Sequence, residues 1–140
     1  MEINKSLVIP CKDEGPEFVI ILKRFISYLK NDTEVIVVVD SKDDSTISEI
    51  EKSDLDVPIL INTYGKGPAY AVRFGIDNSN GKAVCVAMGD GSDDPKQVED
   101  LFFSVNHLIY KKYFPYFLKN IHNTLLDHPK LMSKFFYGLF

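Results

Sequence analysis

Blocks of hydrophobic and polar residues follow one another along the chain in a pattern that predicts alternating strands and helices. Short apolar runs, rich in β-branched side chains, predict four strands, at residues 6–10, 34–39, 58–61 and 83–88. Apolar side chains at helical spacing predict helices at 16–30, from 44 or 45 to about 52, at 67–80, and from 95 onward. This order implies right-handed crossovers, and therefore a mainly parallel sheet with helices on both faces.

Single residues sharpen several of these elements. The strand at 34–39 is β-branched almost throughout, which predicts burial on both of its faces. Asp44 or Ser45 is suited to cap the second helix, and Asp94 to cap the last one just before Pro95. Gly81 is expected to close the helix at 67–80.

Length and composition place the chain among ordinary globular proteins. With 140 residues, 45% hydrophobic and 26% charged, it is long enough for one domain with a real core. The net charge of −4 argues against nucleic acid as a partner. Two cysteines, Cys11 and Cys85, form no disulfide framework, and no signal peptide is visible, so we expect a reducing, cytoplasmic location.

The charge divides the chain into two regions, which we expect to differ in role. Residues 1–100 hold 11 Lys and Arg against 19 Asp and Glu, whereas residues 101–140 hold five lysines against Asp127 alone. The second region also carries 11 of the 17 aromatic residues and all three histidines. We expect a helical tail that serves first for packing or self-association into a homo-oligomer. Contact with an anionic membrane surface ranks second, and an appended segment after a truncated reading frame third.

Polar clusters follow three of the predicted strands, at residues 10–15, 40–45 and 90–94. In open parallel sheets, ligands bind at the edge where the carboxyl ends of the strands lie. Carboxylates gathered there repel one another unless a cation or hydrogen-bond donors lie between them. Oxygen ligands of this kind suit Mg²⁺ or Mn²⁺ bridging a carboxylate and substrate phosphates. The third strand leads into Tyr64-Gly65-Lys66-Gly67, flexible backbone plus a cation before a helix, where an anion is favoured.

Taken singly, each cluster is explained better by helix capping than by function, and other motifs fail on spacing. The glycines at 65 and 67 lack the pattern of a phosphate-binding P-loop. A calcium loop starting at Asp40 would place Lys42 at its third position and Ser45 at its sixth, where glycine is required. A receiver-like phosphoacceptor domain would need an aspartate after the third strand, and residues 61–63 provide none. Only the coincidence of several clusters favours a site.

Four blocks of sequence together resemble a known family: "SLVIPCKDEG", "EVIVVVDSKDDST", "YGKGPAYAVRFGI" and "GKAVCVAMGDGSDDP". In this order and at these intervals they are similar to the nucleotide-binding half of family 2 glycosyltransferases, such as dolichyl-phosphate mannosyltransferases and polyprenyl-phosphate glucosyltransferases. The resemblance covers roughly residues 5–100. It implies a Rossmann-like GT-A three-layer sandwich with a mainly parallel sheet, truncated and followed by the helical tail.

The resemblance assigns binding roles to matched positions. Pro10, Cys11 and Glu14 correspond to the segment that lines the base and ribose of a nucleotide-sugar. Asp40 matches the aspartate that contacts the base. The loop of Gly65, Lys66 and Gly67 corresponds to one that passes the nucleotide.

Asp90 matches the second aspartate of the family's Asp-x-Asp motif, which implies that it binds a divalent cation, Mg²⁺ or Mn²⁺, on the diphosphate. The first aspartate of the motif is replaced by Met88, so that the motif is Met-Gly-Asp. Asp94 is then the cap before Pro95. The resemblance thus separates a metal ligand from a structural acid four residues further on.

The implied function is metal-dependent transfer of a sugar from a UDP- or GDP-sugar to an acceptor, with a lipid phosphate at a membrane surface as one candidate. The acceptor half of the family has no counterpart after residue 100, where Asp127 is the only acidic residue. No catalytic residue is therefore assigned. The alternative is a catalytically incomplete fragment or subunit that binds sugar nucleotide without transferring it.

Overall fold

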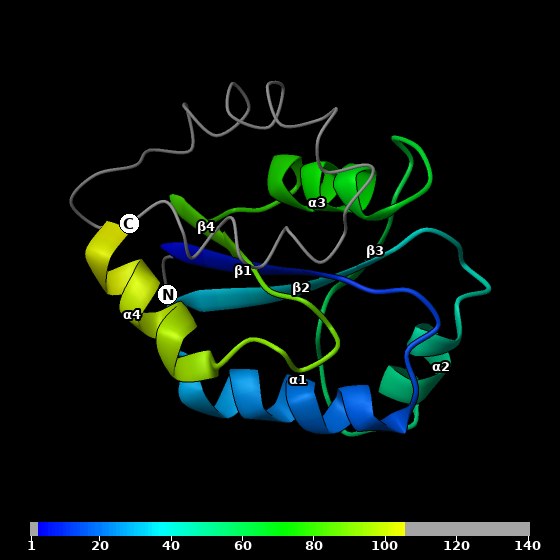
Figure 1. Cartoon of the computed structure of the whole chain (residues 1–140), viewed down its shortest axis with the longest axis horizontal. Coiled ribbons are helices and arrows are strands. Elements are labelled where there is room, and N and C mark those ends of the chain that lie inside the picture. Colours follow the sequence, from blue (N-terminus) through cyan, green and yellow to red (C-terminus); the bar gives the residue numbers. More distant parts are fainter. Residues whose placement is uncertain (1–2, 106–140) are drawn as a thin grey trace.

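The computed structural model describes residues 3–105, which form a sheet between two layers of helices (Figure 1). The elements in chain order are β1 (Lys5–Pro10), α1 (Pro16–Tyr28), β2 (Thr33–Val39), α2 (Ser45–Glu51), β3 (Ile59–Ile61), α3 (Pro68–Asp77), β4 (Ala83–Val86) and α4 (Pro95–Val105). Every strand and helix that the hydrophobic pattern predicts is therefore present in this part of the chain.

The sheet has the strand order β3-β2-β1-β4, and all three neighbouring pairs are parallel. Val8 in the central strand β1 lies opposite Ile36 of β2 and Val86 of β4. In Figure 1, α3 covers one face of the sheet, and α1, α2 and α4 lie on the other side. The prediction of a parallel sheet with helices on both faces is confirmed.

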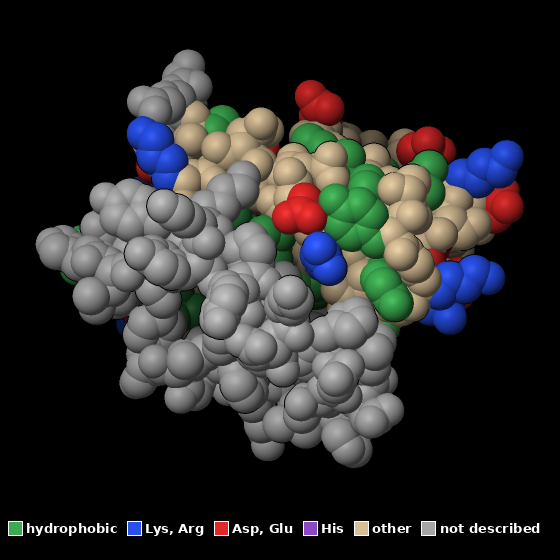
Figure 2. Space-filling model, turned by 90° about the horizontal axis from the view of Figure 1, so that it is seen from above, with side chains coloured by type: hydrophobic (Ala, Val, Ile, Leu, Met, Phe, Trp, Pro, Cys, Tyr) green, Lys and Arg blue, Asp and Glu red, His purple; other side chains and the backbone are tan. Residues whose placement is uncertain are grey.

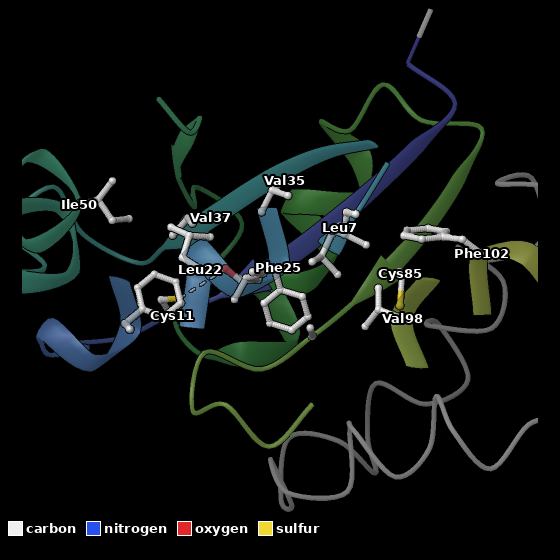
Figure 3. Close-up of a cluster of buried hydrophobic side chains, with 14 of the residues drawn as sticks. Leu7, Cys11, Leu22, Phe25, Val35, Val37, Ile50, Cys85, Val98 and Phe102 are labelled. Atoms are coloured by element: carbon white, nitrogen blue, oxygen red, sulfur yellow. Dashed lines mark hydrogen bonds between the residues drawn. The ribbon is translucent and has the colours of Figure 1, made fainter. Parts of the chain in front are cut away.

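The larger core lies between the sheet and α1, and Figure 3 shows its side chains. Because side chains alternate along a strand, β2 contributes Val35, Val37 and Val39 to this face. They pack in one cluster with Leu22 and Phe25 of α1, which are both fully buried.

The opposite face carries the smaller core, between the sheet and α3. Here β2 contributes Ile36 and Val38, so the prediction that this strand is buried on both faces is confirmed. Gly75 lets α3 approach closely, because a Cβ atom at this position would lie 2.4 Å from a methyl carbon of Val8.

The prediction that Gly81 closes the helix at 67–80 is wrong. Helix α3 ends at Asp77, with Asn78 as its C-cap. Gly81 instead lies against the start of β1: a Cβ atom there would come within 2.5 Å of the Lys5 carbonyl carbon and 2.6 Å of the Ser6 nitrogen. A close approach between two chain segments, which local sequence does not reveal, is what requires glycine here.

Helix α4 runs across residue 100, and Phe102 is only 2% exposed within the larger core. The predicted tail from residue 106 onward, with its histidines and Asp127, lies outside the described residues. None of the helices between residues 3 and 105 is both long and apolar enough to cross a bilayer.

Candidate functional site

Hydrogen bonds join the carboxyl ends of β1 and β2 through the first turn of α2. Asp44 is 7% exposed, and its Oδ1 accepts from the Thr46 amide at 2.9 Å, so Asp44 caps α2 as one of the two predicted candidates. The same oxygen accepts from the Asp13 amide at 3.1 Å, and Thr46 Oγ1 accepts from the Glu14 amide at 2.9 Å. Two successive amides of the β1–α1 loop therefore donate to side chains at the start of α2. The sequence did not indicate that Asp44 binds this loop as well as capping the helix.

Cys11 follows β1 as part of the core rather than as a reactive group. Its amide donates to the Val38 carbonyl at 2.8 Å, just beyond the point where Pro10 pairs with Val38, and its side chain is 6% exposed. Burial, and then the charges of Glu14 and Asp44, raise the pKa of the Cys11 thiol far above its ordinary value. The group stays a neutral thiol near neutral pH, and it can line a ligand but not act as a thiolate.

Asp93 and Asp94 shape the turn that follows β4. Asp93 is 4% exposed, and its Oδ2 accepts from the Met88 amide at 2.7 Å, which closes the turn. Asp94 Oδ1 accepts from the Lys96 amide at 2.9 Å, so Asp94 caps α4 as predicted. Only the folded structure shows that the buried Asp93 closes its own turn.

Asp90 is exposed at the tip of this turn, and its Oδ1 accepts from the Ser92 amide at 3.0 Å. The backbone beside it lies against the β1–α1 loop: a Cβ atom at Gly89 would lie 3.0 Å from Cys11 Sγ and 3.3 Å from Glu14 Oε1. Burial, and then the charges of Asp90 and Asp44, raise the pKa of Glu14. Acidic side chains that follow β1, β2 and β4 therefore interact at one edge of the sheet, as the topology predicted.

Asp40 lies at the end of β2 and binds the loop between β3 and α3, residues 62–67, which we call the β3–α3 loop. Its Oδ1 accepts from Asn62 Nδ2 and its Oδ2 from the Gly67 amide, each at 2.7 Å. Lys66 is exposed between two glycines that both have positive φ. Asn62 was not predicted as a site residue from the sequence. The available signal was its position, since it is a polar amide directly after the apolar strand β3.

An aromatic and charged cluster anchors the same loop on α3, and Figure 2 views the face of the molecule that α3 covers. The rings of Tyr64 and Phe74 meet edge to face, with their centres 5.1 Å apart. Tyr64 donates from its hydroxyl to Asp77 Oδ2 at 3.0 Å, and the Arg73 guanidinium lies 5.8 Å from the Tyr64 ring centre. In Figure 2 hydrophobic, acidic and basic side chains lie next to one another on the described part of this face.

The site thus has two neighbouring parts along one sheet edge. Glu14, Asp44 and Asp90 form an acidic part at β1, β2 and β4, while Asp40 and the β3–α3 loop form a second part at β2 and β3. Within residues 3–105, no three His, Cys, Asp or Glu side chains are arranged to hold a metal ion on their own.

Comparison with known proteins identifies the family to which the chain belongs. Residues 6–114 match the family described as glycosyl transferase family 2, so the chain belongs to this family. Similar solved structures include a mannosyltransferase, PcManGT from Pyrobaculum calidifontis, in complex with GDP-Man and Mn²⁺, with a TM-score of 0.60 and 18% identity. Another is residues 1–349 of S. aureus TarS, solved alone and with UDP-GlcNAc, with TM-scores of 0.53 and 0.52 and 22% identity.

These likenesses establish the fold. The matches cover 75% of this chain and 33% of the mannosyltransferase, and 74% of this chain and 32% or 31% of the two TarS structures. The four-stranded parallel sheet with its helices corresponds to part of a GT-A fold, as the resemblance implied. The chain spans about a third of the length of these structures. It has no significant match among curated proteins.

Proposed function

We propose that the chain binds a UDP- or GDP-sugar at the carboxyl edge of its sheet, with Mg²⁺ or Mn²⁺ between Asp90 and the diphosphate. One observation carries the proposal: Asp90 is exposed at the end of β4, in a turn whose backbone at Gly89 lies against Cys11 and Glu14 of the β1–α1 loop. Burial, and then the charges of Asp90 and Asp44, raise the pKa of Glu14, and the part of this rise that comes from neighbouring carboxylates favours a bound cation.

The residues present fit such a cation when substrate completes its coordination. Asp90 supplies a carboxylate that the turn holds through its bond with the Ser92 amide, and Glu14 lies close by as a second acid. Mg²⁺ is commonly bound by one or two carboxylates plus substrate phosphates. The similar mannosyltransferase was solved with both GDP-Man and Mn²⁺.

The nucleoside has a place in the same proposal. Pro10, Cys11 and Glu14 line its base and ribose from the β1–α1 loop, and Asp40 serves the base from the end of β2. The Gly65-Lys66-Gly67 segment lies at the start of α3, where a helix N-terminus and a lysine both favour an anion. The similar TarS structure contains UDP-GlcNAc.

The reaction that we propose for this site is sugar transfer. In it the bond between the sugar's anomeric carbon and the diphosphate oxygen breaks, an acceptor oxygen forms a bond to the same carbon, and the nucleoside diphosphate leaves. Asp90 would hold the cation, which would supply electrostatic stabilisation of the charge on the leaving diphosphate, and the β1–α1 and β3–α3 loops would orient the donor. A lipid phosphate is the acceptor we propose. It would be met at a membrane surface, with the chain beyond α4 serving for packing, self-association or membrane contact.

A second candidate is a sugar-nucleotide-binding unit that does not transfer sugar. The observation that favours it is coverage, since the residues that match similar structures make up about a third of those chains. Binding without transfer is expected if the acceptor site and the catalytic base belong to another part or partner. Incubation of the intact chain with a labelled donor and a polyprenyl phosphate separates the two candidates.

Calorimetric titration of the intact chain tests the binding proposal. The ligands are UDP, GDP and their sugar nucleotides, each with and without Mn²⁺. A ligand at about 100 times its Kd should also stabilise the fold by about 2.7 kcal/mol. Asp90→Ala should abolish the part of the affinity that depends on Mn²⁺. Asp94→Ala is the matched control, an exposed acid four residues away that caps α4, and it should lower stability while leaving that part intact. Equal losses of Mn²⁺-dependent affinity in the two variants would refute the role of Asp90.

A further inference from the structure

One buried carboxamide holds the β3–α3 loop. Asn62 is 7% exposed, and its Nδ2 donates both to Asp40 Oδ1, at 2.7 Å, and to the Gly65 carbonyl. Its Oδ1 accepts from the Tyr64 amide at 2.9 Å. Both ends of the side chain are therefore engaged, and two residues of the loop are bound to it.

Asp40 completes this arrangement from the neighbouring strand. While its Oδ1 accepts from Asn62, its Oδ2 accepts from the Gly67 amide at 2.7 Å. The two side chains stand next to each other because β2 and β3 are parallel and adjacent, and the Asn62 amide itself donates to the Val39 carbonyl at 2.8 Å. The pair thus binds the loop backbone at residues 64, 65 and 67.

The loop needs such support because its own sequence is flexible. Gly65 has φ 154° and Gly67 has φ 108°, values that L side chains rarely adopt. A Cβ atom at Gly65 would lie 3.0 Å from the Tyr70 ring, which packs beneath the loop. Glycine loses more conformational entropy on ordering than any other residue. The hydrogen bonds from Asp40 and Asn62 therefore determine how strongly the β3–α3 loop populates this conformation.

We propose that Asn62 is a positioning residue for nucleotide binding, which acts together with Asp40 by holding the β3–α3 loop in its binding conformation. This inference rests on the proposed function. The pair fixes the backbone on both sides of Lys66, so that the phosphates of the ligand meet a loop that is already ordered. Asp40 therefore contributes to affinity through the loop as well as at the base.

The first test is Asn62→Asp in the intact chain. This variant keeps the shape of the side chain but removes two donors and places a second carboxylate against Asp40. The Kd for UDP or GDP, whichever the unaltered chain binds, should rise about tenfold or more, and hydrogen exchange at the Gly67 amide should accelerate. Asn78→Asp is the matched control: it adds the same charge at the far end of α3, where Asn78 is exposed, and should change neither quantity.

The second test combines Asp40→Asn with Asn62→Asp. In the double variant the new amide at position 40 can donate to the new carboxylate at position 62 and still accept from the Gly67 amide, while the bond to the Gly65 carbonyl stays lost. The substitution at 62 should therefore weaken binding in the unaltered chain but improve it severalfold in the Asp40→Asn background. This second comparison also decides the matter if Asn62→Asp alone does not fold.

The outcomes separate the inference from the function on which it rests. If the unaltered chain binds neither UDP nor GDP, the proposed function fails, and exchange at the Gly67 amide still reports whether the pair holds the loop. If the chain binds nucleotide but Asn62→Asp leaves the Kd and the Gly67 exchange unchanged, the inference is overturned. It is also overturned if the double variant binds no more tightly than Asp40→Asn alone.

Discussion

Replacing Asp44 with alanine removes two hydrogen bonds that end on one carboxylate oxygen. The bond from the Thr46 amide is the N-cap of α2, and loss of such a cap costs about 1 kcal/mol, within a range of about 0.5–2. The bond from the Asp13 amide has a charged acceptor, but Asp13 is exposed and water can replace the lost partner, so we assign it about 1 kcal/mol. We therefore expect Asp44→Ala to lower the free energy of unfolding by about 2 kcal/mol.

Asp94→Ala is the matched comparison, because Asp94 caps α4 with a single bond to the Lys96 amide and is exposed. Only the cap is lost, so about 0.5–1 kcal/mol is expected. Urea unfolding should show a lower midpoint for both variants at an unchanged m-value, with the larger shift for Asp44→Ala. At about 3–5 °C per kcal/mol for a chain of this size, Tm should fall by about 6–10 °C in Asp44→Ala.

A second measurement distinguishes Asp44 from an ordinary cap. Burial raises the pKa of Glu14 most, followed by the charges of Asp90 and Asp44, so Asp44→Ala should lower that pKa without returning it to the ordinary value. NMR titration of the Glu14 carboxyl group measures this directly. An equal or larger loss of stability in Asp94→Ala, or a Glu14 pKa unchanged by Asp44→Ala, would refute the reasoning.

Two further predictions concern the amino-terminal end of the sheet. Burial would raise the pKa of Glu34, but hydrogen bonds from Ser6, Asn80 and the Gly81 amide outweigh it and lower that pKa below its ordinary value of 4.5. The stability that Glu34 contributes is therefore present above pH 4.5 and lost as the pH falls through the folded-state pKa. Glu34→Gln should flatten the acid side of a plot of the urea midpoint against pH. An unchanged slope on the acid side would contradict this prediction. Lys5 is 5% exposed, with its Nζ 3.1 Å from a Glu99 carboxylate oxygen and 3.4 Å from one of Asp32. Lys5→Met should cost about 2 kcal/mol in urea unfolding, because it removes a buried cation from between two partly buried carboxylates, of which Glu99 keeps Lys30 Nζ at 3.5 Å. Lys23→Met, which breaks an exposed pair, should leave the midpoint nearly unchanged, and equal effects of the two substitutions would refute the argument.

Hydrophobic periodicity by itself determined the elements of the fold and the parallel sheet with helices on both faces, but not the order of the strands. Strands such as Thr33–Val39 are recognisable because burial on both faces demands a continuous apolar run, and alternation with helices leaves a parallel sheet as the consistent topology. The caps at Asp44 and Asp94 could be predicted for the same reason, since a cap acts on amides two residues away. Four ordered blocks of residues were also enough to indicate the family.

Only the tertiary structure decided contacts between residues distant in sequence. Asp40 and Asn62 are 22 residues apart, and Asp44 and Asp13 are 31 apart, so no local pattern links them. The same holds for Gly81, whose lack of a side chain serves a close approach to β1 rather than a helix end. Local propensity reflects each residue's immediate neighbours along the chain, whereas the packing of strands against one another determines which distant side chains meet. The sequence could therefore place acids at the strand ends, but only the fold shows that Asp44 and Asp93 hold loops while Asp90 remains exposed.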